Sequence, residues 1–169
     1  MVESFNQVVL EEIFKDIDPN EKGKTLIFAV DDDHADMITR ILKKYYSDQG
    51  ISEECVMKIT GSIENGNPEK IKEAIRRFKN ETYPNIVVTV DLLTTGIDVE
   101  EIVNLVFMRR IRSRILFEQM LGRATRLCPE IGKTHFEIYD AVGVYNALES
   151  VSTMKPVVAN PSITFDDLI

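Results

Sequence analysis

The sequence predicts an α/β domain in which a mainly parallel sheet is covered by helices on both faces. Short, continuous apolar runs, the pattern of buried parallel strands, alternate with amphipathic helical patterns about every 20–30 residues. The predicted strands are residues 25–30, 55–59, 85–90, 103–108 and 135–139. The predicted helices are residues 3–16, 34–48, 69–79, 114–122 and 141–148.

Residues with strong local preferences mark the ends of these elements. Residues 18–20, Asp-Pro-Asn, end the first helix. Asp33 is the predicted N-cap of the second helix and Gly50 its stop. Between them the apolar side chains recur at intervals of three and four: Ala35, Ile38, Ile41, Leu42 and Tyr45. Pro68 lies near the start of the third helix, where its fixed φ is favourable.

A chain of 169 residues, 44% of them hydrophobic, is expected to form one domain. Residues 1–20 are predicted to be a lead-in helix, residues 21–149 the α/β lobe, and residues 150–169 an irregular tail. The sequence has no run of eighteen apolar residues, so no membrane span is predicted. The two cysteines are not spaced as zinc ligands, and no metal site is predicted. Since the N-terminus lacks a signal-peptide pattern, a reducing, cytoplasmic location is expected.

The distribution of charge differs from its average. A net charge of −8 taken as an average argues against nucleic acid binding. Residues 109–126, however, hold six arginines and one acid, Glu118. Acidic residues are concentrated elsewhere, at residues 31–33, 53–54, 98–101 and 166–167. The chain can therefore offer a local anion-binding site.

This arginine-rich segment ends in an octapeptide suited to phosphate, Gln119-Met120-Leu121-Gly122-Arg123-Ala124-Thr125-Arg126. The spacing of Arg123 and Arg126 places both guanidinium groups on one face of a helix. Such planar, permanently charged groups bind oxyanions. The alternative interpretation is a helix surface with ordinary salt bridges.

A second phosphate-related pattern, Thr94-Thr95-Gly96-Ile97-Asp98, follows the third predicted strand. In a parallel sheet the loops after the strands share one edge, where ligands bind. The segments expected at that edge are residues 31–33, 60–62, 91–98 and 109–114. Hydroxyl groups there are typical contacts of a nucleic acid backbone, although the same residues are also ordinary turn formers.

In this order, these segments resemble the motifs of superfamily 2 helicases and translocases. Gln119-x-x-Gly122-Arg123-x-x-Arg126 resembles motif VI, and residues 91–98 resemble motif V. Residues 26–30 are similar to motif IV, and residues 60–62, Thr-Gly-Ser, match the small motif after the next strand. The resemblance covers about residues 20–145 and implies the second RecA-like lobe of a motor, with a three-layer α/β fold.

The longer sequence segments that contain these motifs are similar to the motor (R) subunit of type I restriction enzymes, over residues 88–98, 105–110 and 113–128. This resemblance implies ATP-driven translocation on double-stranded DNA. The repair helicase of bacterial nucleotide excision is similar over the same stretch, to a lesser degree. One departure is that many family members have threonine directly before the aspartate of motif V. Here that position is Val90, and Thr89 comes one residue earlier.

The resemblance assigns roles at the nucleotide. Arg123 and Arg126 are implied to be arginine fingers for the γ-phosphate of ATP on a partner lobe, and Gln119 to orient them or contact the nucleotide. Gly96 would let the backbone approach the nucleotide. Asp98 would accept hydrogen bonds from ribose hydroxyls or a motif VI arginine. The alternative makes them a turn glycine and a helix N-cap.

Contacts with DNA phosphates are expected from two groups of residues at this edge. The first group contains the small residues of two loops, Thr60, Gly61, Ser62, Thr94 and Thr95. The second contains Arg109 and Arg112, for which a solvated loop is the alternative.

The chain contains no Gly-x-x-x-x-Gly-Lys-Ser/Thr loop and no Asp-Glu-x-His strand end. These motifs hold the phosphates and Mg²⁺, so ATP and Mg²⁺ are expected mainly on a first RecA-like lobe. The chain alone is not expected to hydrolyse ATP. Implied partners are that first lobe and a nuclease domain of the same full-length chain, DNA, and methyltransferase and specificity subunits, with no membrane.

Two other functions compete. The first is the second lobe of another superfamily 2 helicase, either a DNA helicase like that of nucleotide excision repair or an RNA helicase. The second is a phospho-acceptor signalling domain, suggested by residues 31–33 and Asp91. That domain needs a lysine at the end of the fifth strand, where this chain has Tyr139 and Asp140.

Overall fold

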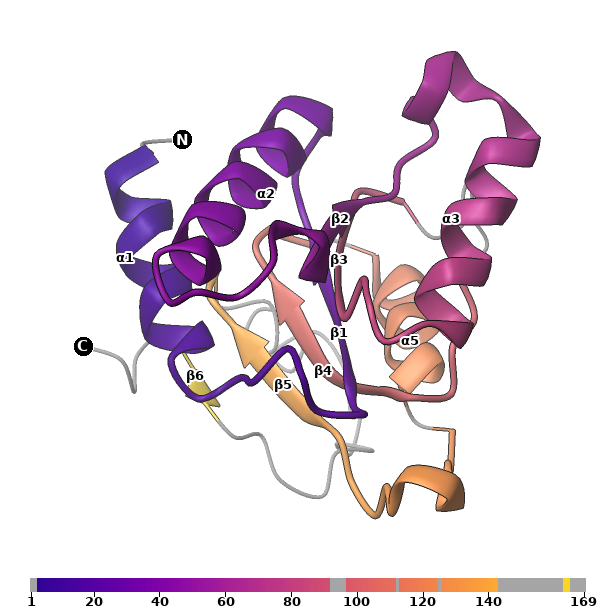
Figure 1. Cartoon of the computed structure of the whole chain (residues 1–169). Coiled ribbons are helices and arrows are strands. Elements are labelled where there is room, and N and C mark those ends of the chain that lie inside the picture. Colours follow the sequence, from indigo (N-terminus) through magenta and orange to yellow (C-terminus); the bar gives the residue numbers. More distant parts are fainter. Residues whose placement is uncertain (1–2, 92–96, 112, 125, 143–162, 165–169) are drawn as a thin grey trace.

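A computed structural model of the chain describes residues 3–91, 97–111, 113–124, 126–142 and 163–164. The described elements form three layers, a sheet between two layers of helices (Figure 1). The predicted α/β class and the helices on both faces are therefore confirmed. None of the described helices combines the length and apolar character needed to cross a bilayer.

The sheet consists of parallel pairings between its described strands. The strands are β1 (Lys24–Phe28), β2 (Val56–Lys58), β3 (Ile86–Thr89), β4 (Ile102–Phe107), β5 (Glu137–Asp140) and β6 (Ile163–Thr164). Their order is β2-β3-β1-β4-β5-β6, and each neighbouring pair is parallel. Every residue of β1 is buried, as the apolar run predicts for a strand with a neighbour on each side and helices on both faces.

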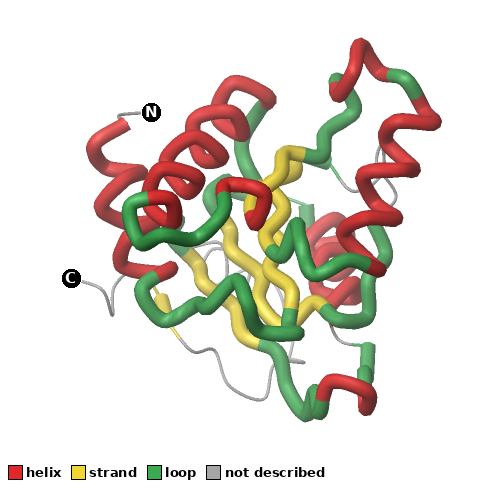
Figure 2. Tube along the Cα trace, viewed as in Figure 1, coloured by secondary structure: helices red, strands yellow, loops and turns green. Residues whose placement is uncertain are grey.

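The described helices lie on both faces of the sheet (Figures 1 and 2). Helices α1 (Glu3–Phe14) and α2 (Asp32–Ser47) lie on one face. Helices α3 (Pro68–Asn80) and α5 (Arg114–Ala124) lie on the other. Short 3₁₀ turns occupy Glu53–Cys55, Ile63–Gly66 and Pro129–Ile131.

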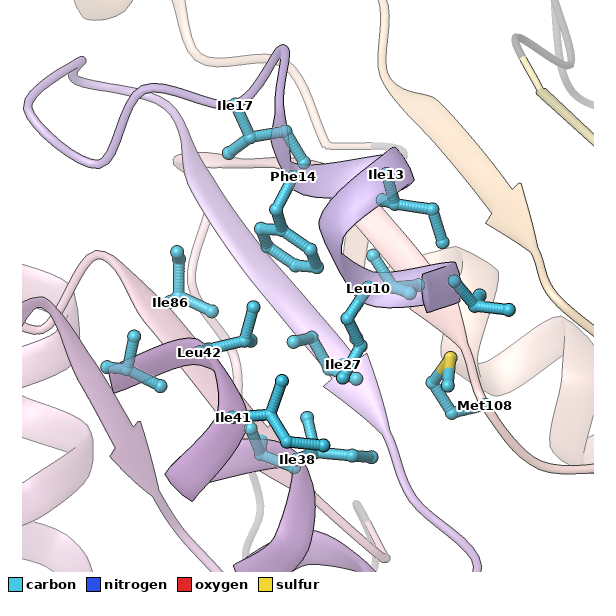
Figure 3. Packing of buried hydrophobic residues seen from close by; sticks show 14 of the residues in the cluster. Leu10, Ile13, Phe14, Ile17, Ile27, Ile38, Ile41, Leu42, Ile86 and Met108 are labelled. Atoms are coloured by element: carbon cyan, nitrogen blue, oxygen red, sulfur yellow. The ribbon is translucent and has the colours of Figure 1, made fainter. Parts of the chain in front are cut away.

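The core beneath α1 and α2 joins the lead-in helix to the lobe. Leu10 and Phe14 of α1 and Leu42 of α2 pack over Ile27 of β1, and all four side chains are buried (Figure 3). Burying a large apolar side chain contributes about 1.5–3 kcal/mol. Residues 3–14 therefore belong to the same folded unit as the strands that follow them.

The core on the opposite face is dominated by aromatic rings. The rings of Phe28 in β1 and Phe107 in β4 are stacked, with centroids 5.2 Å apart. Phe117 of α5 lies 5.5 Å from Phe107, measured between ring centroids. This packing fixes α5, and with it the arginine-rich segment, against the sheet.

The N-cap prediction for α2 was wrong by two residues. The cap is Asp31, which has an extended backbone and accepts a hydrogen bond from the His34 N–H at 2.8 Å. Asp33 lies inside the first turn of the helix. Three consecutive aspartates are equally good caps by composition, and the end of β1 decides which one carries the extended conformation.

The predicted tail also needs correction. Residues 163–164, expected to be irregular, form β6 and pair in parallel with β5. Their β-branched side chains suit a strand, and β5 offers an open edge. The predicted helix at residues 141–148 lies outside the described residues from residue 143 onward.

Candidate nucleotide and nucleic-acid edge

The segments that follow β1, β2, β3 and β4 lie at one edge of the sheet, because parallel strands end on the same side. Residues 30–33, 59–62, 90–91 and 108–111 stand there, as expected from the sequence (Figure 1). Among the predicted site residues, Thr94, Thr95, Gly96 and Arg112 lie outside the described residues.

Arg126 is bound to two carboxylates at the opposite edge of the sheet, where the strands begin. There the Glu101 carbonyl accepts from the Lys24 N–H at the start of β1, and Lys133, which precedes β5, binds the Glu100 carbonyl. Residues 91–98 were all expected at the edge where the strands end, so the placement of Asp98 corrects that expectation.

Arg126 contacts both carboxylates through its terminal nitrogens. Its Nη1 lies 2.8 Å and 2.9 Å from the two carboxylate oxygens of Asp98, and its Nη2 lies 2.5 Å from Oε1 of Glu100. The expected contact between Asp98 and a motif VI arginine is thus present in the structure. Arg126 also has the local ion pairs that the alternative interpretation of this segment expects.

Sequence reasoning did not single out Glu100 as a site residue. The signal was present in the alternation of residues 97–100, because Ile97 and Val99 are buried while Asp98 is exposed and Glu100 is half-buried. Both carboxylates bind Arg126.

The expected placement of Arg123 and Arg126 on one helix face is corrected by the structure. Helix α5 ends at Ala124, so Arg126 lies beyond it. The following segment turns back through a bridge between Cys128 and Lys133. The backbone of Arg123 remains in the last turn of the helix.

The Thr-Gly-Ser loop after β2 is held by Asp32 in the first turn of α2. Thr60 Oγ1 donates to Asp32 Oδ1 at 2.6 Å, and Ser62 Oγ donates to the same oxygen at 2.8 Å. Lys58 Nζ donates to Asp32 Oδ2 at 3.0 Å and lies 2.7 Å from Oδ1 of Asp36.

The hydrogen bond from Thr60, together with those from Lys58 and Ser62, lowers the pKa of Asp32 to about 2. The carboxylate is therefore charged across the ordinary pH range. The Thr60 hydroxyl is buried against it, whereas Ser62 remains exposed. Of the two hydroxyls, Ser62 is the one that a bound backbone can reach without moving the loop.

Arg109 lies within the rim instead of projecting from it. Its Nη1 donates to the backbone carbonyl of Val90 at 2.9 Å, which joins the segment after β4 to the segment after β3. The side chain is half-buried, and its Nε is buried without a hydrogen-bond partner among the described residues. The next residue, Arg110, is exposed.

Other candidate residues have structural partners. Asp31 caps α2, and Asp140 ends β5 with a carboxylate that accepts from the Val142 N–H at 3.2 Å. The fifth strand thus ends without the lysine of a phospho-acceptor pocket. Within the described ranges, no three His, Cys, Asp or Glu side chains are grouped to hold a metal ion.

Comparison with known proteins places this arrangement in a family. Residues 6–128 match the helicase conserved C-terminal domain. The chain belongs to this family. The match includes most of α1, the four strands β1 to β4 and all of α5, and so contains every described residue among the predicted site residues.

Restriction enzyme subunits are among the relatives of this helicase domain. It is 46% identical over 171 residues to the EcoKI endonuclease subunit of Escherichia coli K12, covering 100% of this chain and 14% of that protein. It is 36% identical over 124 residues to the Escherichia coli EcoAI endonuclease subunit, covering 72% of this chain and 15% of that protein. The chain spans about one seventh of the length of these relatives.

Solved structures confirm the RecA-like fold. A fragment assigned to an HsdR subunit of a type I restriction enzyme from Vibrio vulnificus YJ016 matches with a TM-score of 0.73 and 29% identity, covering 98% of this chain and 32% of that chain. Domain 2 of the DEAD-box helicase Mss116p matches with a TM-score of 0.68 and 19% identity, covering 96% and 59%. The second likeness supports the fold alone.

Proposed function

We propose that this helicase domain is the second motor lobe of an ATP-dependent double-stranded DNA translocase, in the R subunit of a type I restriction-modification enzyme. The observation that carries the proposal is the joint position of two motifs. The carboxylate of Asp98 and the guanidinium of Arg126, which lie 28 residues apart, meet beside the end of α5. The 46% identity to the EcoKI subunit across the whole chain supports the assignment to restriction enzymes.

In this proposal, Arg123 and Arg126 act on a triphosphate that another lobe holds with Mg²⁺. Guanidinium groups placed against the charge of the transferring phosphoryl group accelerate its transfer by about 10³–10⁵. Gln119, four residues before Arg123 in the sequence, would orient it. Asp98, with Gly96 before it, accepts hydrogen bonds from the ribose hydroxyls when Arg126 turns to the phosphates.

The residues predicted to bind DNA fall into two groups: those that contact the DNA backbone and those that position the contacting loops. We assign backbone contacts to Gly61 and Ser62, with Thr94, Thr95 and Arg112 completing the surface. Thr60 and Arg109 have internal partners, Asp32 and the Val90 carbonyl, so their role in this proposal is to position the loops. Contacts of this kind position DNA without reading its sequence.

The remaining partners follow from the same proposal. The first RecA-like lobe, which binds ATP and Mg²⁺, and the nuclease domain belong to the same full-length chain. The methyltransferase and specificity subunits complete the enzyme in the cytoplasm. Closing of the two lobes on ATP and their opening after hydrolysis would move one set of DNA contacts relative to the other.

The deciding experiment is Arg123→Ala in the intact R subunit. The DNA-stimulated rate of ATP hydrolysis is expected to fall by at least about 10², with an unchanged circular dichroism spectrum. Arg114→Ala is the matched control, because Arg114 pairs with Glu118 on the same helix and should leave the rate unchanged. An unchanged rate in Arg123→Ala would refute the finger role. Stimulation by duplex RNA in place of duplex DNA would instead favour another superfamily 2 helicase.

A further inference from the structure

Glu100 and Asp98 both bind Arg126. These ion pairs compete with the role proposed for Arg126, which is to bind the phosphates of ATP. Arg126 donates with Nη1 to Asp98 and with Nη2 to Glu100. A guanidinium group that grips a phosphate through both terminal nitrogens uses these same two nitrogens. Because each terminal nitrogen carries two N–H donors, a triphosphate that binds Arg126 in this way must share Nη2 with Glu100 or displace it.

The position of Glu100 is fixed by its own backbone. Lys133 Nζ donates to the Glu100 carbonyl at 3.0 Å, and Lys133 is 9% exposed. Val99, the residue before Glu100, is fully buried. The turn that carries the carboxylate is thus anchored on both sides, and Glu100 meets Arg126 in a prepared position.

The contact is weak enough to exchange. The side chains of Arg126 and Glu100 are 45% and 43% exposed, so water screens their attraction. Exposed pairs of this kind change an equilibrium by no more than about fivefold. A multiply charged triphosphate brought up by the other lobe can replace such a carboxylate.

We propose that Glu100 is a positioning residue that holds Arg126 beside the end of α5 between turnovers and competes with the triphosphate for it. This inference rests on the proposed motor function. When Arg126 turns from Asp98 to the phosphates, Glu100 competes with the triphosphate for Nη2. Glu100 thereby limits ATP binding when the two lobes are not driven together by DNA.

The test uses Glu100→Gln in the intact R subunit and a fluorescent, non-hydrolysable ATP analogue. The variant should bind the analogue about two- to fivefold more tightly without DNA, since one competing carboxylate is removed. Its KM for ATP should fall by a similar factor, with kcat nearly unchanged. The difference from the unaltered protein should shrink as salt rises.

Two controls separate this role from a general change in charge. Glu118→Gln removes an equally exposed carboxylate from α5, where it pairs with Arg114, and should leave analogue binding unchanged. In an Arg126→Gln background, Glu100→Gln should have no further effect, because Glu100 acts through Arg126.

The outcomes distinguish the two proposals. If Arg126→Gln leaves both analogue binding and turnover unchanged, the finger role of Arg126 and this inference fail together. If Arg126→Gln weakens binding but Glu100→Gln does not tighten it, the role of Glu100 alone is refuted. That role is also refuted if Glu100→Gln tightens binding equally with and without Arg126.

Discussion

Thr60 Oγ1 donates a 2.6 Å hydrogen bond to Oδ1 of Asp32, which ties the end of β2 to the first turn of α2. The hydroxyl is one that sequence reasoning assigned to DNA. Its burial against a charged partner makes it a structural group first. The loop that it holds then presents Gly61 and Ser62 at the ligand edge.

Thr60→Val should therefore act on stability more than on DNA contact. We expect a loss of about 1–2 kcal/mol in the free energy of unfolding, because a hydrogen bond to a carboxylate is removed. Urea unfolding at pH 7 measures this loss. Ser62→Ala, at an exposed position, should cost less and should weaken DNA binding more. Equal stability of Thr60→Val and the unaltered protein would contradict this assignment.

Stability should depend on pH through His34. His34 Nδ1 accepts from the Val30 N–H at 3.1 Å and Nε2 lies 3.2 Å from Asn6 Oδ1, so the bonded ring is neutral with its proton on Nε2. Burial lowers the pKa of His34 below its usual 6.5. As the pH falls, His34 is therefore protonated in the unfolded chain before it is protonated in the folded protein. The contribution of neutral His34 to the free energy of unfolding is complete above pH 6.5 and is lost as the pH falls from there through the pKa of the folded state.

The measurement is the urea midpoint between pH 8 and pH 5. His34→Gln should be less stable at pH 8 and should show a flatter decline below about pH 6.5. His135→Gln is the control, since the side chain of His135 is 57% exposed and should leave the decline in place. An unaltered decline in His34→Gln would assign the pH dependence to other groups.

Lys24→Met should be among the most destabilising single changes. The buried Nζ of Lys24 donates to the backbone carbonyls of Glu81 and Pro84 and lies 5.6 Å from the centroid of the Phe78 ring. Methionine keeps the unbranched apolar part of the side chain but leaves these carbonyls without their donor. We expect a loss of about 2–3 kcal/mol by urea unfolding. The exposed Lys22→Met should change stability by no more than about 0.5 kcal/mol.

Thr89→Val should be neutral or stabilising, by up to about 1 kcal/mol. Thr89 Oγ1 is fully buried and has no hydrogen-bond partner in the described part of the chain, so the variant loses only an unsatisfied polar group. The control is Thr25→Val on the neighbouring strand, where Thr25 Oγ1 accepts from Asn104 at 3.1 Å. That variant should be destabilised. A drop in stability for Thr89→Val as large as for Thr25→Val would show that its hydroxyl has a partner.

Gly122→Ala should have opposite effects on the stability of the isolated domain and on ATP hydrolysis by the intact R subunit. A Cβ at Gly122 would meet no atom within 4 Å, so alanine should stabilise the isolated helix by about 0.5–1 kcal/mol. In the intact R subunit the same change should lower ATP hydrolysis if another lobe approaches this backbone closely. Gly50→Ala is the control, because its φ of +80° should make alanine destabilising. Full activity of Gly122→Ala would exclude such close approach.

The order and class of the elements could be predicted because both depend on local patterns. Apolar runs such as residues 25–28 have few alternatives to a buried strand, and Pro68 can stand only near the start of a helix. The motif resemblance, and not a local pattern, predicted the contact between Asp98 and Arg126. Local patterns did not place the end of α5, because the turn from Cys128 to Lys133 pulls Arg126 off the helix.

The burial pattern and the order of the elements along the chain were properties that the amino-acid sequence determined by itself, since periodicity leaves little choice. Only the tertiary structure decided which polar side chains are available to a ligand and which ones position other side chains. Thr60 meets Asp32 and Arg126 meets Glu100 across 28 and 26 residues. Such pairings depend on the register of neighbouring strands and the packing of helices on them, which no local window of sequence contains.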